Sequence, residues 1–191
     1  KSLRYPVCFK SYYILLQAQV QGERMSIRIL SDETINKIAA GEVVENPASV
    51  VKEVIENAID AKATNIVIEI NGGGFSLIRV SDNGVGMNRD DLILSLERHA
   101  TSKIKNSDDI NDIQSMGFRG EALASIGSVS KLRLTSCHSD SKIGAQIECN
   151  GGQLTDIKEK GHPQGTTLEI YSLFFNVPAR KKFQKSKGAS Q

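Results

Sequence analysis

The chain has 191 residues, 39% of them hydrophobic and 24% charged, a composition typical of one globular domain that buries a core without disulfides or metal. Its net charge is +2, but residues 1–24 carry +3 and residues 180–191 carry +5, so the body between them carries −6 and offers no global basic field to a polyanion. The cysteines are scattered in no metal-ligand spacing, and the apolar run at 12–18 is too short to span a membrane.

Residues 1–24 form an extension to which the sequence assigns no role. They begin with basic residues, as a secretory signal peptide does, but they lack its long apolar region and its small-residue cleavage site. Recognisable periodic patterns begin only after Met25. We therefore expect one domain over residues 25–191, in a protein that is neither secreted nor inserted in a membrane.

Two helices are expected first along this domain. Residues 32–40 read as a short helix that is capped by Ser31 or Asp32 and ended by Gly41. A longer helix over 47–61 starts with a proline, which suits a first helical turn. Its apolar residues recur with helical spacing and form one face that needs a sheet to pack against: Val50, Val51, Val54, Ile55, Ala58 and Ile59.

The second helix carries the first candidate site. Glu53 and Asn57 are four residues apart and project from the same face, and Glu56 and Asp60 repeat the spacing beside them. Spacing alone favours a solvated helix face. However, asparagine is a poor interior helix former, and Glu53 and Asn57 border the apolar stripe instead of opposing it. A carboxylate beside an amide oxygen could hold Mg²⁺ and a water together.

A hairpin and a helix are expected next. The β-rich runs 65–70 and 76–82 are joined by the sequence Asn-Gly-Gly-Gly at 71–74, which is typical of a hairpin turn. A further helix is expected at about 89–97.

The sequence SDNGVGM, 81–87, ends the second of these runs with an acid and two alternating glycines. A simple turn explains Gly84 well. It explains Gly86 less well, because a second glycine would let the backbone approach a flat ligand closely. Asp82 at the strand end could accept a hydrogen bond from an exocyclic amine.

Two later stretches suggest an anion site. RHATSKI, 98–104, gathers basic and hydroxyl residues at a helix end, and SMGFRGEALASIGS, 115–128, places Gly117 and Gly120 before a helix that starts at Glu121. Glycine N–H groups and a helix N-terminus favour phosphate, although an ordinary mobile loop capped by a helix fits the stretch equally well. The usual P-loop and Rossmann phosphate motifs are absent or incomplete, which disfavours both classes of enzyme.

The remaining chain predicts strands and a basic tail. One sheet with helices segregated on one face is an α+β two-layer sandwich. The basic tail at 180–187 could contact nucleic-acid phosphates, although charge runs are usually solvated helix faces. The expected strands form a mostly antiparallel meander over 130–137, 144–150, 153–159 and 165–173.

Taken in order, these pieces resemble the ATPase region of the MutL family of DNA mismatch-repair proteins, within the GHKL superfamily. The E-x-x-x-N and D-x-G-x-G patterns alone reach only the superfamily, which also includes type II topoisomerases, chaperones and histidine kinases. The resemblance covers the chain from about residue 27 to its end, and what points to MutL is the long block at 38–64 together with GFRGEAL and NVPAR. The matching blocks are IAAGEVVENPASVVKEVIENAIDAKAT (38–64), IRVSDNGVGM (78–87), RHATSKI (98–104), GFRGEALASI (117–126), GTTLEI (165–170) and FFNVPARKKF (174–183).

The resemblance implies a site for ATP and Mg²⁺. Glu53 matches the general base that activates the attacking water, and Asn57 matches the Mg²⁺ ligand. Asp82 matches the carboxylate that accepts from the adenine amine, with Thr166 or Thr167 nearby in the purine pocket.

The resemblance also implies a fold and a lid. The fold is the Bergerat sandwich, with a mostly antiparallel mixed sheet and helices on one face. Gly84 and Gly86 match glycines that let the backbone approach the nucleotide closely. Two segments match the ATP lid: Thr101, Ser102 and Lys103, and Gly117, Phe118, Arg119, Gly120 and Glu121.

One departure bears on activity. In this family a lysine from a following domain reaches the γ-phosphate, and that domain would start near residue 191. Without that cation the developing transition-state charge is less stabilised. We therefore expect the isolated chain to bind Mg-ATP weakly and to hydrolyse it slowly or not at all, and the intact protein to be a slow ATPase.

The implied biology is a conformational switch in mismatch repair. ATP would order the lid and drive dimerisation of two such domains around DNA, which the intact protein contacts weakly and without sequence preference. Its partners would be a mismatch-recognition protein and downstream repair factors, in a bacterial cytoplasm or a eukaryotic nucleus. The alternatives are a nucleotide-binding interaction module without turnover, or a topoisomerase- or chaperone-type ATPase of the same superfamily.

Overall fold

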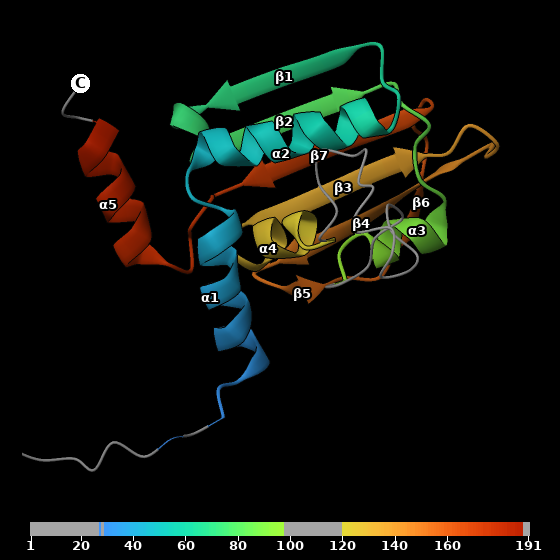
Figure 1. The fold of residues 1–191 in the computed structure, drawn as a ribbon. Coiled ribbons are helices and arrows are strands. Elements are labelled where there is room, and N and C mark those ends of the chain that lie inside the picture. Colours follow the sequence, from blue (N-terminus) through green and yellow to red (C-terminus); the bar gives the residue numbers. More distant parts are fainter. Residues whose placement is uncertain (1–26, 28, 98–119, 189–191) are drawn as a thin grey trace, which may run out of the picture.

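The computed structural model describes residues 27, 29–97 and 120–188, which form one seven-stranded sheet with helices packed on it (Figure 1). The strand order is β1-β2-β7-β3-β4-β5, with β6 also pairing with β4, and all these pairs are antiparallel. The strands are β1 (Ile66–Asn71), β2 (Leu77–Asp82), β3 (Lys131–Cys137), β4 (Gly144–Asn150), β5 (Gln153–Leu154), β6 (Lys158–Lys160) and β7 (Gly165–Tyr171).

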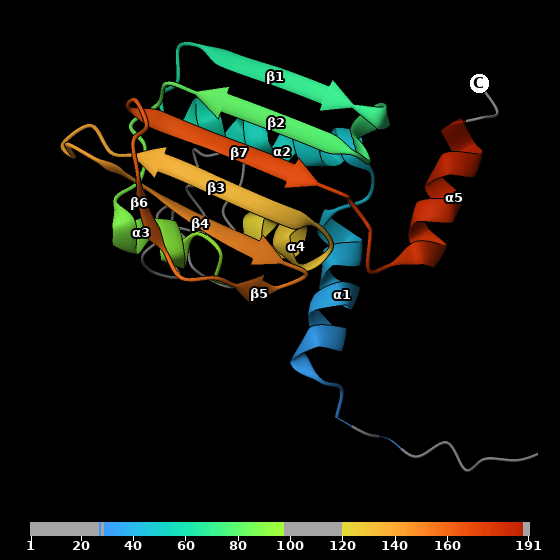
Figure 2. The same ribbon diagram turned by 180° about the vertical axis from the view of Figure 1, so that it is seen from behind.

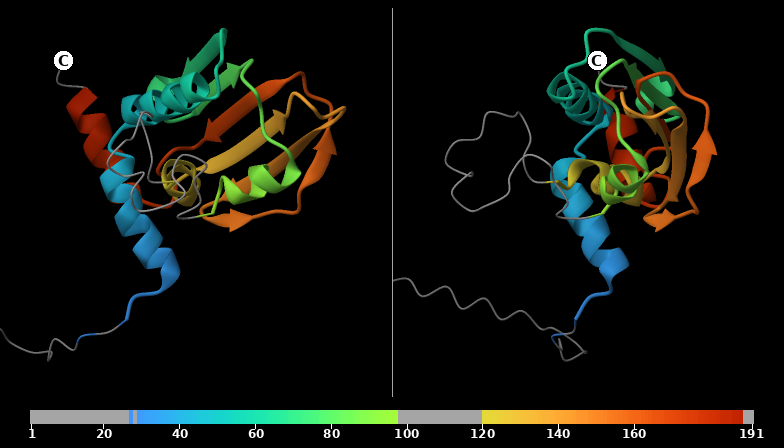
Figure 3. Two further views of the ribbon diagram at one scale, coloured as in Figure 1. Left: turned by 45° about the vertical axis from the view of Figure 1, so that its right-hand side comes forward. Right: turned by 90° about the vertical axis from the view of Figure 1, so that its right-hand side faces the viewer.

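Three of the five described helices form the second layer. Figure 1 shows α2, α3 and α4 on the same face of the sheet, and Figure 2 shows the opposite face, which no described helix covers. The right-hand view of Figure 3 shows these two layers from the side. The predicted α+β sandwich is thus confirmed. The helices are α1 (Asp32–Val43), α2 (Pro47–Asp60), α3 (Arg89–Leu94), α4 (Ala122–Ser128) and α5 (Pro178–Gly188), with a short 3-10 turn, η1, at Gly72–Gly74.

Helix α2 follows directly from its sequence. Asn46 caps it by accepting from the Ser49 N–H at 2.9 Å, and the Ser49 hydroxyl accepts from the Asn46 N–H at 3.1 Å, which is a reciprocal capping box. Pro47 occupies the first turn, where no helical hydrogen bond is lost. The face predicted to be apolar does turn toward the sheet, although Ile59 at its margin remains 46% exposed. The residues it buries are Val50, Val54 and Ala58.

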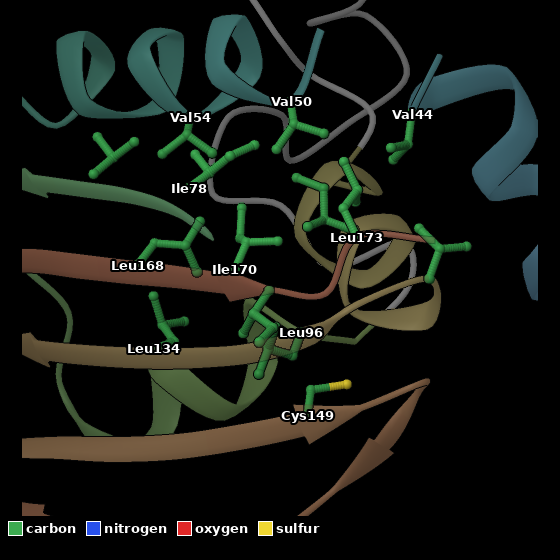
Figure 4. Close-up of a cluster of buried hydrophobic side chains, with 14 of the residues drawn as sticks. Val44, Val50, Val54, Ile78, Leu96, Leu134, Cys149, Leu168, Ile170 and Leu173 are labelled. Carbon is green, nitrogen blue, oxygen red and sulfur yellow. The ribbon is translucent and has the colours of Figure 1, made fainter. Parts of the chain in front are cut away.

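The core lies between the helices and the inner face of the sheet (Figure 4). Alternate residues of the central strands point into it, as the two-residue period of a strand requires. Phe174, just after β7, is fully buried in it. The sheet residues are Ile78, Val80, Leu132, Leu134, Leu168 and Ile170, and the helix residues include Val50, Val54, Leu92 and Ile126.

Four sequence-based expectations differ from the structure. Helix α1 does not end at Gly41 but continues to Val43. Ala40 and Val44, which flank residues 41–43, are both buried, and this burial holds the last residues in the helix. Helix α3 ends at Leu94 instead of near 97. The run 153–159 divides into the short strands β5 and β6. Strand β7 does not continue a meander but returns to lie between β2 and β3.

Strand β7 lies at the centre of the sheet. It joins the β1-β2 hairpin to the group β3-β4-β5-β6. β7 pairs along its length with β2 on one side and with β3 on the other. It is therefore the strand that brings the early and late halves of the domain together. No described helix is long and apolar enough to cross a membrane.

Candidate functional site

The candidate site lies where the ends of α2, β2 and β3 and the start of β7 meet, on the right in Figure 1. Glu53 and Asn57 lie one helical turn apart on α2, and both are partly buried. Glu56, on the neighbouring position, forms an ion pair with Lys52 at 3.0 Å. Of the two acids that repeat the i, i+4 spacing, Glu56 and Asp60, Glu56 is therefore already paired with a lysine of the same helix.

Asp82 ends β2 on the inner face of the sheet. Its Oδ1 accepts the Gly84 N–H at 2.8 Å, and its backbone partner across the sheet is Thr166. Burial raises the pKa of the Asp82 carboxyl, while hydrogen bonds from the Gly84 and Thr166 backbones and the charge of His162 oppose the rise. Asp82 thus offers a partly desolvated acceptor at the strand end, and a hydrogen bond to such a group is stronger than the same bond in water.

The loop after Asp82 is fastened to the end of α2. Asn83 accepts at Oδ1 from the N–H groups of Thr64 and Asn65, each at 2.8 Å, and donates to the Thr64 hydroxyl at 2.9 Å. The Val85 N–H donates to the Ala61 carbonyl at 2.9 Å. These bonds fix Asp82 relative to the helix that carries Glu53 and Asn57.

The glycines of this loop have a clear folding role. A Cβ on Gly84 would lie 2.7 Å from the Ala61 carbonyl oxygen. Gly86 has φ +71°, and a Cβ there would lie 2.0 Å from the Cys137 carbonyl oxygen. Both glycines are therefore needed for close contact with the protein's own backbone, and their predicted approach to a nucleotide stays a prediction.

The structure separates the two threonines that the sequence left open. Thr166 lies on the inner face, directly opposite Asp82. Thr167 lies on the outer face, where its hydroxyl is 2.7 Å from the Ser81 hydroxyl and 2.8 Å from His162 Nε2. Only Thr166 is placed beside Asp82.

Sequence reasoning missed Ser136 on β3, which is fully buried beside Thr166. Its Oγ lies 2.8 Å from Thr166 Oγ1, donates to the Gly165 carbonyl at 2.9 Å and accepts from the Met87 N–H at 2.8 Å. It thereby joins β3, β7 and the loop after β2. No local motif marks this serine, because its partners lie far away in sequence.

The predicted lid is described only at its last residues. Gly120 has φ +61°, as a glycine allows, and Glu121 precedes the first residue of α4, which starts at Ala122. Six other predicted site residues lie outside the described residues, as does His99. They are Thr101, Ser102, Lys103, Gly117, Phe118 and Arg119.

The oxygen donors of α2 suit Mg²⁺ only if phosphate oxygens of a ligand also coordinate the metal. The described residues contain no group of three or more His, Cys, Asp or Glu side chains that could hold a metal. Glu53 and Asn57 supply a carboxylate and an amide oxygen on one helix face. Mg²⁺ commonly takes one or two protein oxygens and completes its octahedron with water and substrate phosphates, so this donor set fits a nucleotide-bound Mg²⁺.

Comparisons with known proteins identify the family of this chain. A family model described as "Histidine kinase-, DNA gyrase B-, and HSP90-like ATPase" matches residues 44–171. The DNA mismatch repair protein MutL of Acidobacterium capsulatum is 55% identical over 160 residues, which cover 84% of this chain and 24% of that protein. The chain thus spans about a quarter of the length of such curated relatives.

Solved structures share the fold. The Aquifex aeolicus MutL ATPase domain complexed with ADP is 38% identical, with a TM-score of 0.55, and the match covers 74% of this chain and 48% of that one. The N-terminal domain of a DNA repair protein is 30% identical, with a TM-score of 0.66, and the match covers 81% of this chain and 44% of that one.

Proposed function

This chain belongs to the histidine kinase-, DNA gyrase B- and HSP90-like ATPase family, in the group of the mismatch-repair protein MutL, and on that premise we propose that it binds Mg-ATP as a conformational switch. Residues 25–191 would form the ATP-binding domain, and residues 1–24 would lie outside it. Hydrolysis to ADP and phosphate would be slow in the intact protein and weak or absent in this chain alone.

The observation that carries the proposal is the pairing of Asp82 with Thr166 next to the end of α2. Asp82 presents an acceptor that burial has partly desolvated. An adenine amine has the donors that such an acceptor requires. Because the Val85–Ala61 bond holds this strand end against α2, a nucleotide anchored at Asp82 would direct its phosphates along the helix face that carries Asn57 and Glu53.

Asn57 and Glu53 would divide the phosphate chemistry between them. The Asn57 amide oxygen would hold the metal, with the remaining ligands supplied by the triphosphate and water. When bound, Mg²⁺ would neutralise phosphate oxygens and so lower the barrier to attack on the γ-phosphorus. The Glu53 carboxylate would orient one water and accept its proton as the oxygen attacks.

The lid residues and a cation from outside the chain would complete the reaction. Lys103, together with the glycine N–H groups at 117 and 120, would close over the triphosphate. A lysine of a following domain would stabilise the charge that develops on the γ-phosphate.

In the intact protein the bound nucleotide would act as a switch. Ordering of the lid would favour association of two ATP-bound domains around DNA, and this state would engage a mismatch-recognition protein and downstream repair factors. Such a protein would work where the chromosome lies, in a bacterial cytoplasm or a eukaryotic nucleus.

The experiment that tests this proposal separates ATP binding from hydrolysis in the intact protein. Glu53→Gln should keep the affinity for Mg-ATP while lowering the single-turnover hydrolysis rate by about 100-fold or more, the usual contribution of a general base. Glu56→Gln is the matched control, because Glu56 is paired with Lys52, and it should leave the rate unchanged. Equal rates in all three proteins would refute the role of Glu53, and nucleotide binding without any turnover would favour an interaction module.

A further inference from the structure

Ser136 has a hydrogen-bond arrangement that fixes the direction of each of its bonds. Its Oγ contacts the Met87 N–H at 2.8 Å, the Gly165 carbonyl oxygen at 2.9 Å and Thr166 Oγ1 at 2.8 Å. The side chain is fully buried, so the protein must satisfy this hydroxyl without bulk water.

Counting hydrogens assigns the donors. A serine hydroxyl has one hydrogen and two acceptor positions. The Gly165 carbonyl can only accept, so it takes the single Ser136 hydrogen. The Met87 N–H can only donate, so it fills one of the two acceptor positions. The Ser136–Thr166 contact therefore uses the Thr166 hydrogen, with Thr166 as donor.

This assignment constrains what Thr166 offers to a ligand. With its hydrogen committed to Ser136, Thr166 Oγ1 presents only acceptor positions on the side of Asp82. Asp82 is an acceptor as well when ionised, and Gly84 already occupies its Oδ1. The strand ends of β2 and β7 then present acceptors alone, which suits an amine and opposes a carbonyl.

We propose that Ser136 is a positioning residue that orients the Thr166 hydroxyl as an acceptor and thereby strengthens selection of 6-amino over 6-oxo purine nucleotides. Ser136 itself does not touch the base. The selectivity part rests on the proposed nucleotide site, whereas the orientation of Thr166 does not and can be measured without nucleotide.

The chain supplies a matched control on the other face of β7. Ser81 and Thr167 also form a hydroxyl pair, at 2.7 Å between β2 and β7, but on the outer face. Ser81→Ala removes the serine partner of a threonine hydroxyl, as Ser136→Ala does, but the threonine affected is Thr167 and not Thr166. Ser136→Cys serves as a second variant that keeps a side chain of similar shape with only a weak donor and acceptor.

The first measurement uses the nucleotide-free chain. In a mixture of H₂O and D₂O, a slowly exchanging hydroxyl splits the Cβ resonance of its threonine into two lines. We expect this splitting at Thr166 in the unmodified chain and in Ser81→Ala, and its loss in Ser136→Ala and Ser136→Cys. No splitting in the unmodified chain, or splitting that persists in both Ser136 variants, would overturn the proposed orientation.

The second measurement compares the affinities for ATP and ITP. The two bases differ at position 6, an amine in ATP and a carbonyl in ITP, and at N1, which accepts in ATP and carries a hydrogen in ITP. In Ser136→Ala the freed Thr166 hydroxyl can donate to the carbonyl, so the ATP/ITP affinity ratio should fall about fivefold, the value of one ordinary hydrogen bond. In a Thr166→Val background, Ser136→Ala should cause no further change in the ratio. An equal loss for both nucleotides would show that Ser136 acts only on the structure.

The two measurements also separate this inference from the proposed function. If the unmodified chain binds neither nucleotide, the proposed function and the selectivity that rests on it both fail. The Cβ splitting then still decides whether Ser136 orients Thr166. If ATP binds and the ratio is the same in Ser136→Ala, the nucleotide site stands and the selectivity role of Ser136 is refuted.

Discussion

Arg79 on β2 lies directly opposite Glu169 on β7, and its Nε and Nη2 donate to one carboxylate oxygen of Glu169 at 3.1 and 3.0 Å. The same register, three residues along, places Asp82 opposite Thr166. A slip of one residue would turn Thr166 to the outer face and remove it from Asp82. The charged pair on the outer face therefore helps to specify the candidate site on the inner face.

Glu169 lies at the centre of a row of alternating charges on five neighbouring strands. Arg133 on β3 also approaches Glu169, at 3.5 Å, and donates to Glu148 at 2.8 Å, while Arg79 also pairs with Glu69. Burial raises the pKa of the Glu169 carboxyl, but hydrogen bonds from Tyr171 and Arg79 and the charges of both arginines outweigh it and lower that pKa overall.

Glu169→Gln should destabilise the domain by about 1–3 kcal/mol at neutral pH, because it removes hydrogen bonds that involve charged groups. The stabilisation from a lowered carboxyl pKa is present above the unfolded value, near 4.5, and is lost as the pH falls through the lower folded value. The difference between the two proteins should therefore shrink below about pH 4.5. Urea denaturation at several pH values measures this, and a difference that grows in acid would contradict it.

Gly86→Ala should destabilise the domain by at least about 2 kcal/mol, since it combines a positive φ with a Cβ 2.0 Å from the Cys137 carbonyl oxygen. Gly161→Ala is the matched control, because its Cβ would meet nothing within 4 Å and no positive φ is found there. Thermal denaturation should show a lowered Tm for the first variant alone. Similar Tm values for both would show that the loop has room to move away from β3.

Arg180 attaches helix α5 to the end of α1. Its guanidinium donates to the Gly41 carbonyl at 2.6 Å and lies 5.1 Å from the centre of the Phe174 ring. Arg180→Ala should cost about 1–2 kcal/mol and expose α5 to proteolysis, because a charge-assisted bond and a cation–π contact are both lost. Lys182→Ala removes the same charge from an exposed position of α5 and should change neither property.

Asp82→Asn should show opposite effects on folding and on binding. A carboxyl pKa raised by burial means that the stability contributed by Asp82 is complete below its unfolded value, near 3.8, and is lost as the pH rises through the folded value. At neutral pH the variant should therefore be at least as stable as the unmodified chain. It should bind ATP about tenfold or more weakly, because a charged acceptor for the amine is gone. A less stable variant with unchanged ATP affinity would contradict both expectations.

Local signals in the sequence were sufficient for the elements that local interactions define. Pro47 with the apolar spacing of 47–61 predicted α2, and the Asn-Gly-Gly-Gly turn predicted the β1-β2 hairpin. The end of α1 was predicted wrongly at Gly41, because burial of Val44 and the contact from Arg180 are tertiary and override a local stop signal.

Only the site residues that belong to local sequence motifs could be predicted. Glu53, Asn57 and Asp82 stand in recognisable patterns, and the structure places their two elements together through the Val85–Ala61 bond. The choice of Thr166 over Thr167 needed the register of β7, and Ser136 needed the pairing of β7 with β3. Both depend on strand pairing between residues far apart in the chain, which no local pattern encodes.

The most direct test of the nucleotide site is a calorimetric titration of ATP into the 191-residue chain, first with Mg²⁺ and then with EDTA. We expect weak but measurable binding with Mg²⁺, reduced about tenfold or more in EDTA, and a similar reduction in Asn57→Ala, which loses the metal ligand. If the folded chain binds neither ATP nor ADP in either buffer, the proposed nucleotide site is refuted.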